Sequence, residues 1–148
     1  MRTIVLSIIF LVFLYVNAHA QSQNDSTSIV QILEKESTTW RNGDMKAHAD
    51  CWKIQPYSRI LVSTADGKMI DVPPSLMINP PAGMMGNGGT FAISDNKISI
   101  IGNSAWVNFS EESISKEGQK SHSYEIKILE KINGSWKIVG QSIHLYNK

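Results

Sequence analysis

The stretch ESTTWRNGDMKAHADCW, residues 36–52, holds two of the chain's four tryptophans and a Gly-Asp step between them. Apolar residues recur with the helical period from Ile29 to Trp40, and Glu36 falls on the same stripe. Gly43 predicts the end of this helix, because glycine readily adopts the left-handed conformation that follows a helix C-terminus. Asp44 is a typical cap for a second helix. The segment therefore predicts two consecutive helices, each with a tryptophan near its end.

The first twenty residues predict a secretory signal peptide. Arg2 precedes an apolar run from Ile4 to Val16, and Ala18-His19-Ala20 places small residues at the positions expected before a cleavage site. The run is shorter than the roughly 20 residues that a membrane-spanning helix needs. We therefore expect cleavage before Gln21, a periplasmic or secreted protein, and no stable membrane anchor afterwards.

The rest of the chain predicts a polar tether at residues 21–27 and one domain at residues 28–148. Loss of Arg2 leaves 13 basic residues against 13 acidic ones, so no basic surface favours nucleic acid. Cys51 is the only cysteine, which excludes an intramolecular disulfide. It is either a small buried side chain or a thiol activated by His48 three residues earlier, and the core reading is favoured.

Beyond Tyr57 the apolar period changes from helical to two. Residues 57–63 and 68–72 flank Asp66-Gly67, a hairpin signal. Residues 73–89 hold four of the five prolines and predict a long loop with at most one helical turn near Ser75–Ile78. The remainder predicts a meander of long strands. Helices followed by long antiparallel strands indicate an α+β fold in which helices cover one face of a sheet.

Three stretches together resemble the nuclear-transport-factor-2-like superfamily, in its SnoaL-like and ketosteroid-isomerase-like branch. They are ILEKESTTWRNGDMKAHADCW, KISIIGNSAWVNF and YEIKILEKINGSWKIVGQSIHL, and the match spans nearly all of residues 28–146. The resemblance implies a cone-shaped α+β fold, with N-terminal helices packed in a strongly curved antiparallel sheet and a pocket at the wide end. It also implies a homodimer, since relatives commonly pair through the outer face of the sheet.

The resemblance leaves the catalytic residues unassigned. Relatives that end in Trp-x-Ile-Val-His-x-His carry two histidines where this chain has Gly140 and Ser142. No Asp or Glu clearly matches the general base of the isomerases, and Asp71 is the nearest alternative. The histidines lack a metal-ligand spacing, so no metal is expected, and no cofactor is implied.

Period-two alternation sorts the strand residues into faces, and a subset of aromatic, polar and flexible residues is predicted to line the pocket. These candidates are Trp40, Trp52, Tyr57, Asp71, Met84, Met85, Asn108, His122, Tyr124, Ser142 and His144. On the last strand, Val139, Ile143 and Leu145 are assigned to the opposite, dimer-forming face. The loop at residues 73–89 is expected to be a lid whose methionines repack around apolar ligands, or alternatively part of the core.

Three functions follow from these expectations. The favoured one is an exported domain that binds a small, mostly apolar molecule. The second is an isomerase, dehydratase or cyclase that uses Asp71 or a histidine as base. The third is a structural homodimer whose pocket is filled by side chains.

Overall fold

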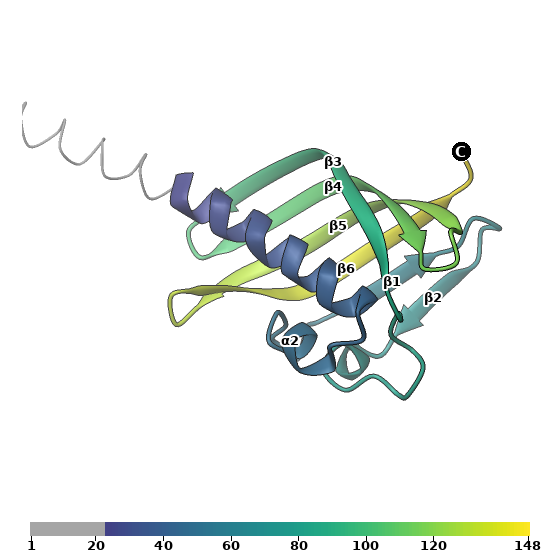
Figure 1. Cartoon of the computed structure of the whole chain (residues 1–148). Coiled ribbons are helices and arrows are strands. Elements are labelled where there is room, and N and C mark those ends of the chain that lie inside the picture. The colour runs from purple at the N-terminus through teal and green to yellow at the C-terminus, as the bar shows by residue number, and fades with distance from the viewer. Residues whose placement is uncertain (1–22) are drawn as a thin grey trace, which may run out of the picture.

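The computed structural model describes residues 23–148, so the predicted signal peptide lies outside the described residues. A long helix, described over residues 23–41, lies across one face of a curved six-stranded sheet (Figure 1). The short helix α2 (Met45–Ala49) follows it beside one end of the sheet. The predicted α+β architecture is confirmed.

The break between the two helices has the predicted chemistry. Gly43 has a φ of +71°, the left-handed conformation that ends the long helix. The Asp44 side chain accepts a hydrogen bond from the Ala47 backbone N–H at 3.0 Å, which caps α2. Both helix boundaries in the opening stretch were therefore readable from the sequence.

The predicted tether was wrong for residues 23–27, which are helical. Asp25 explains the difference, since it is buried against the last hairpin of the sheet. Its carboxylate accepts hydrogen bonds from Lys131 Nζ at 2.6 Å and from Trp136 Nε1 at 3.1 Å. The hydrogen bond from Lys131 lowers the pKa of Asp25. These contacts join sequence positions too far apart for a local pattern to reveal.

Strand β1 (Ile60–Ser63) and strand β2 (Met69–Val72) form the predicted hairpin, and the single-turn helix η1 (Pro74–Met77) begins the proline-rich loop. The four long strands are β3 (Gly89–Ile101), β4 (Ser104–Ser115), β5 (Lys120–Ile132) and β6 (Ser135–Tyr146). The sheet order is β2-β1-β6-β5-β4-β3. One expectation needs correction: β1 runs parallel to β6, so the sheet is mixed rather than wholly antiparallel.

A β-bulge on β6 decides which residues face the helix. The pairing register shifts between Ile128 and Leu129 of β5, so that Val139 on β6 is the extra residue. A bulge reverses the alternation of side chains beyond it. Trp136 and Ile138 are therefore buried before the bulge, and Gln141 and Ile143 lie on the helix-covered side after it.

The sequence prediction assigned the wrong faces of β6 and β5 to the cavity. The bulge explains the error on β6, and the polar character of the inward face explains the error on β5. Ile143 and Leu145, expected on the outer face, line the interior cavity described below. On β5 the polar residues point inward and the more apolar set points outward, since Ser123 and Lys127 are buried whereas Tyr124 and Ile128 are exposed. Alternation alone identifies two faces but not which of them the helix covers.

The hydrophobic core fills the space between the long helix and the covered face of the sheet. Ile29 and Leu33 of the helix pack into one cluster with Val107, Phe109 and Leu129 of the sheet. Trp136 belongs to the same cluster, and so does Trp52, the second tryptophan of the stretch at residues 36–52. Trp52 holds α2 and the following segment on the sheet, because it forms a parallel bridge with Ile138.

Candidate functional site

A cavity of about 320 Å³ lies beyond the core, between the C-terminal half of the long helix and the sheet. Its apolar wall is supplied mainly by β1, β2, η1 and the end of β6. The apolar lining residues are Trp40, Ile60, Val62, Val72, Met77, Met84, Ile143 and Leu145.

The opposite wall of the same cavity is polar and comes from the long helix, β4 and β5, with one residue from β6. Its residues are Glu36, Ser37, Arg41, Glu111, Ser113, Ser121, Ser123, Glu125, Lys127 and Gln141. The lining therefore changes from apolar to ionisable across the sheet. Such a gradient suits a molecule with one apolar part and one polar group.

Lys127 is the centre of the polar wall and is 2% exposed. Its ammonium donates a hydrogen bond to the Glu36 carboxylate, and it lies 3.6 Å from the Glu125 carboxylate. Burial disfavours the charged form of Lys127, but the two carboxylates outweigh this and raise its pKa. A buried ammonium with this pairing is fixed in position and stays charged.

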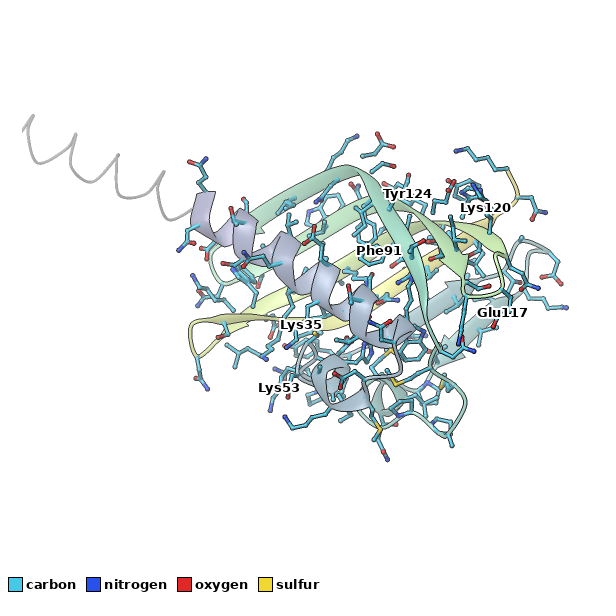
Figure 2. All side chains as sticks on the ribbon, viewed as in Figure 1. Lys35, Lys53, Phe91, Glu117, Lys120 and Tyr124 are labelled. Atoms are coloured by element: carbon cyan, nitrogen blue, oxygen red, sulfur yellow. The ribbon has the colours of Figure 1, made fainter. Side chains whose placement is uncertain are left out.

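Arg41 and Glu111 form the second ion pair of this wall. Glu111 also accepts hydrogen bonds from Ser37 Oγ at 3.1 Å and from Ser113 Oγ at 2.9 Å. The Arg41 guanidinium donates to the Ser37 carbonyl oxygen at 2.9 Å and lies 4.7 Å from the ring centre of Phe91, which is labelled in Figure 2. The hydrogen-bonding capacity of both charged groups is thus largely taken up within the protein.

Glu125 is the carboxyl with the least compensation. It accepts one hydrogen bond, from Ser123 Oγ at 3.0 Å, and its nearest cation is the Lys127 ammonium already paired with Glu36. Burial raises the pKa of Glu125, and the neighbouring Glu111 and Glu36 raise it further against the opposing effect of Lys127. A carboxyl held this way can exchange a proton nearer to neutral pH than an exposed one.

Gln141 faces the same cavity from β6, and 9% of it is exposed. Its Oε1 atom is buried and has no hydrogen-bond partner among residues 23–148. In the ladder Gln141 stands opposite Lys127, and Glu125 is the next inward-facing residue on β5. Buried acceptors are nearly always satisfied in native proteins, so this one calls for an explanation.

His48 and Cys51 lie behind the cavity rather than in it. His48 is fully buried between Trp40 and Trp52, with ring centres 5.0 and 6.2 Å apart respectively. Burial lowers the pKa of His48 and raises that of the Cys51 thiol to about 11. A thiol that is protonated at neutral pH is a poor nucleophile, so the structure favours the core reading of Cys51.

Two of the predicted pocket residues, Trp40 and Met84, line the cavity. The other nine do not, and they divide by location. Trp52 is in the core, and Asn108, His122, Tyr124, Ser142 and His144 were assigned to the wrong face of the sheet. Tyr57, Asp71 and Met85 lie outside the lining, on loops or strand β2.

None of the predicted alternative bases lines the cavity. Asp71 is exposed on β2 and forms an ion pair with Arg59 at 2.5 Å. His122 lies 3.7 Å from Glu112 and stacks on Tyr146, while His144 contacts Ser142 Oγ at 3.0 Å. No group of three or more His, Cys, Asp or Glu side chains in the described part of the chain is arranged to hold a metal ion.

Sequence reasoning missed the ionisable residues that form the polar wall. Glu36 was the available signal, because a carboxylate on the apolar stripe of a helix requires a buried partner. The partner could not be found locally, since Lys127 is 91 positions away. The alternation of Ser123, Glu125 and Lys127 was visible, but it is equally typical of a solvent-facing strand.

Comparisons with known proteins identify the fold through structure alone. No family model and no curated protein matches the sequence. Within residues 23–148 no helix is both long enough and apolar enough to cross a membrane.

Several solved structures are similar over most of their length. An NTF2-like protein with a cystatin-like fold from Novosphingobium aromaticivorans has a TM-score of 0.65 at 13% identity, covering 88% of this chain and 87% of that one. An NTF2-like protein from Cytophaga hutchinsonii has a TM-score of 0.63 at 16% identity, covering 83% and 98%. An NTF2-like protein of unknown function from Shewanella baltica has a TM-score of 0.58 at 18% identity, covering 84% and 96%. The predicted resemblance is confirmed at the level of the fold, and this chain has the NTF2-like, cystatin-like fold.

Proposed function

We propose that this protein is an exported domain that binds a small molecule in the cavity between the long helix and the sheet. The observation that carries the proposal is a cavity lined on one side by apolar side chains and on the other by buried ionisable ones. Its volume of about 320 Å³ is at the lower end of the range for ligand sites, roughly 300–1,000 Å³.

The buried charges support binding over a purely structural role. Replacing buried ion pairs by apolar side chains of similar volume is often neutral or stabilising, so stability alone gives little reason to keep them. The two ion pairs here border open space instead of packed side chains. Met77 and Met84 line that space without filling it, which argues against the alternative of a collapsed pocket.

Native mass spectrometry of protein purified from its own cells tests the proposal. We expect a bound small molecule, visible as a mass above that of the processed chain. Val62→Trp, which places a large side chain in the cavity, should remove it. Leu61→Trp is the matched control, because the neighbouring residue on β1 points away from the cavity. A wild-type mass equal to the bare chain would contradict the proposal.

Export is the part of the proposal that rests on the sequence. Arg2, the apolar run and Ala18-His19-Ala20 support cleavage before Gln21. N-terminal sequencing of the extracted protein should read Gln21 first. An intact Met1 would contradict export by this route.

Glu125 favours a second function, proton transfer on a bound substrate. It is a buried carboxyl with a raised pKa, facing a cavity in which an enolisable molecule has room to bind. It replaces Asp71 and the histidines as the candidate base, because those residues do not reach the cavity. Turnover of a 3-oxo-steroid or a smaller enolisable ketone should be lost in Glu125→Gln and kept in Asp71→Asn. Equal turnover in both variants would exclude this role.

A further inference from the structure

The charges lining the cavity do not balance. The long helix contributes Glu36 and Arg41, β4 contributes Glu111, and β5 contributes Glu125 and Lys127. Strands β1, β2 and β6 and helix η1 contribute no charged residue to the lining, and His48 stands behind Glu36. Two ion pairs account for both cations and for two of the three carboxyls. Glu125 remains as a carboxyl that shares the Lys127 ammonium, 3.6 Å away, with Glu36 and has no cation of its own.

A second, independent observation concerns hydrogen bonding. Gln141 is nine-tenths buried and lines the cavity, and its Oε1 atom has no partner in the described part of the chain. Gln141 and Glu125 are diagonal neighbours on the same face of adjacent strands, a relation that places their Cα atoms about 7–8 Å apart. Both side chains present oxygen acceptors and line the same cavity.

We propose that the cavity takes a ligand bearing a protonated amine on a small apolar body, with the ammonium held by the Glu125 carboxylate and Gln141 Oε1. The inference rests on the proposed binding function and specifies its ligand class. An ammonium is a compact cation with three donors and no acceptor, which matches a carboxylate whose nearest cation is shared, beside an unpartnered oxygen. The apolar body then lies against Val62, Val72 and Ile143 on the opposite wall.

The other ligand charges fit the site less well. An anionic ligand would have to compete with Glu36 and Glu111 for cations that are already paired. A neutral apolar ligand would leave Gln141 Oε1 unsatisfied, and Glu125 would have as its nearest cation only the Lys127 ammonium that it shares with Glu36. Both cases bury polar groups without partners, which opposes binding.

The proposal predicts that binding of the amine is coupled to proton release from Glu125. Where Glu125 is protonated in the free protein, binding of R–NH₃⁺ converts its COOH to COO⁻ and releases one H⁺ to solvent. The groups that face Glu125 are Lys127 and Ser123 on β5, Glu111 on β4 and Glu36 on the long helix. Amine affinity should therefore rise with pH until Glu125 is ionised in the free protein, and fall again when the amine itself loses its proton.

Isothermal titration calorimetry with three shape-matched probes tests the ligand class on the mature chain, residues 21–148. The probes are cyclohexylmethylamine, cyclohexylmethanol and cyclohexanecarboxylate, which share one apolar body and differ in charge. We expect the amine to bind about tenfold tighter than either of the others, as expected for a close, partly buried charge pair. Its apparent enthalpy should change between phosphate and Tris buffers in the direction of proton release.

Variants assign the preference to the two residues. Glu125→Gln should reduce the difference between amine and alcohol to about twofold, and Gln141→Leu should weaken amine binding several-fold with less effect on the alcohol. Glu112→Gln is the control, because this carboxylate is on the same sheet but does not line the cavity. It should leave all three affinities unchanged, and circular dichroism of each variant verifies folding.

The outcomes separate this inference from the proposed function. Binding of the alcohol or the carboxylate as tight as that of the amine would overturn the amine inference and leave cavity binding intact. An amine preference that survives in Glu125→Gln would overturn the assignment to Glu125. Failure of all three probes to bind at millimolar concentration, together with a ligand-free wild-type mass spectrum, would contradict both proposals.

Discussion

The ammonium of Lys127 on β5 is buried against the carboxylate of Glu36, a residue 91 positions earlier on the long helix. This ion pair joins the long helix to the centre of the sheet and lies at the centre of the polar wall of the cavity. Removing one partner of a buried pair leaves an uncompensated charge, which is far more costly than losing the pair itself.

Lys127→Met is therefore expected to lower the free energy of unfolding by about 3–5 kcal/mol, measured by urea denaturation. Lys120→Met is the matched control on the same strand. Lys120 pairs with Glu112 at the surface, where such pairs contribute about 1 kcal/mol or less. The double variant Glu36→Gln with Lys127→Met should recover part of the loss, and a Lys127→Met variant as stable as wild type would contradict the role of the pair.

Glu125→Gln is expected to stabilise the protein at neutral pH while removing amine preference. A carboxyl whose folded-state pKa is raised contributes stability below its unfolded pKa of roughly 4.3, and this is lost as pH rises through the folded value. The variant should thus match wild type near pH 4 and have the higher melting temperature at pH 7–8. A difference in melting temperature between the variant and wild type that shrinks as pH rises would contradict the raised pKa of Glu125.

The outer face of the sheet predicts a homodimer through residues other than those chosen from the sequence. Trp106, Tyr124 and Ile128 are 45, 38 and 50% exposed. Trp106 and Ile128 are cross-strand neighbours in the ladder, and Tyr124 lies further along the same face of β5. Apolar patches of this kind often mark an interface. Light scattering should give twice the chain mass for wild type and one chain for Ile128→Lys. Met69→Lys, at an exposed residue of β2, should stay dimeric, and a monomeric wild type would refute the interface.

The loop at residues 73–89 contains one buried and one exposed methionine. Its two predicted roles, as a lid or as part of the core, can therefore be tested separately. Met77 is 7% exposed, whereas Met84 is 38% exposed, and both line the cavity. The chain after Met84 is held to the long helix by hydrogen bonds from Gly86 N to Trp40 O at 3.0 Å and from Gly88 N to Arg41 O at 2.7 Å. Any opening is therefore expected to involve the segment before Gly86.

Changing Met84 and Met85 together to serine should weaken ligand retention and cost less than about 1 kcal/mol of stability, since neither side chain is buried. Met77→Ser is the control within the same loop and should cost about 2–5 kcal/mol, as usual for truncating a buried methionine. Thermal denaturation together with a binding titration measures both quantities. A large loss of melting temperature in the double serine variant would place these methionines in the core and exclude a lid.

The sequence by itself determined the local features of this protein. The end of the long helix at Gly43, the cap at Asp44 and the hairpin at Asp66-Gly67 each follow from the chemistry of one or two residues. A helical period followed by long stretches of period two was sufficient to predict the α+β fold, because each pattern depends on residues that are neighbours in the chain.

Only the tertiary structure decided which face of the sheet is covered. One extra residue at Val139 reverses the alternation along β6, and period two cannot show the direction in which either face points. Contacts between the helix and the sheet, and between strands, bring together residues from most of the length of the chain. These residues are Glu36, Glu125, Lys127 and Gln141. The candidate site was hidden from the sequence for that reason: the pairing of Glu36 with Lys127 and the position of Gln141 opposite Lys127 join residues that are distant in the chain.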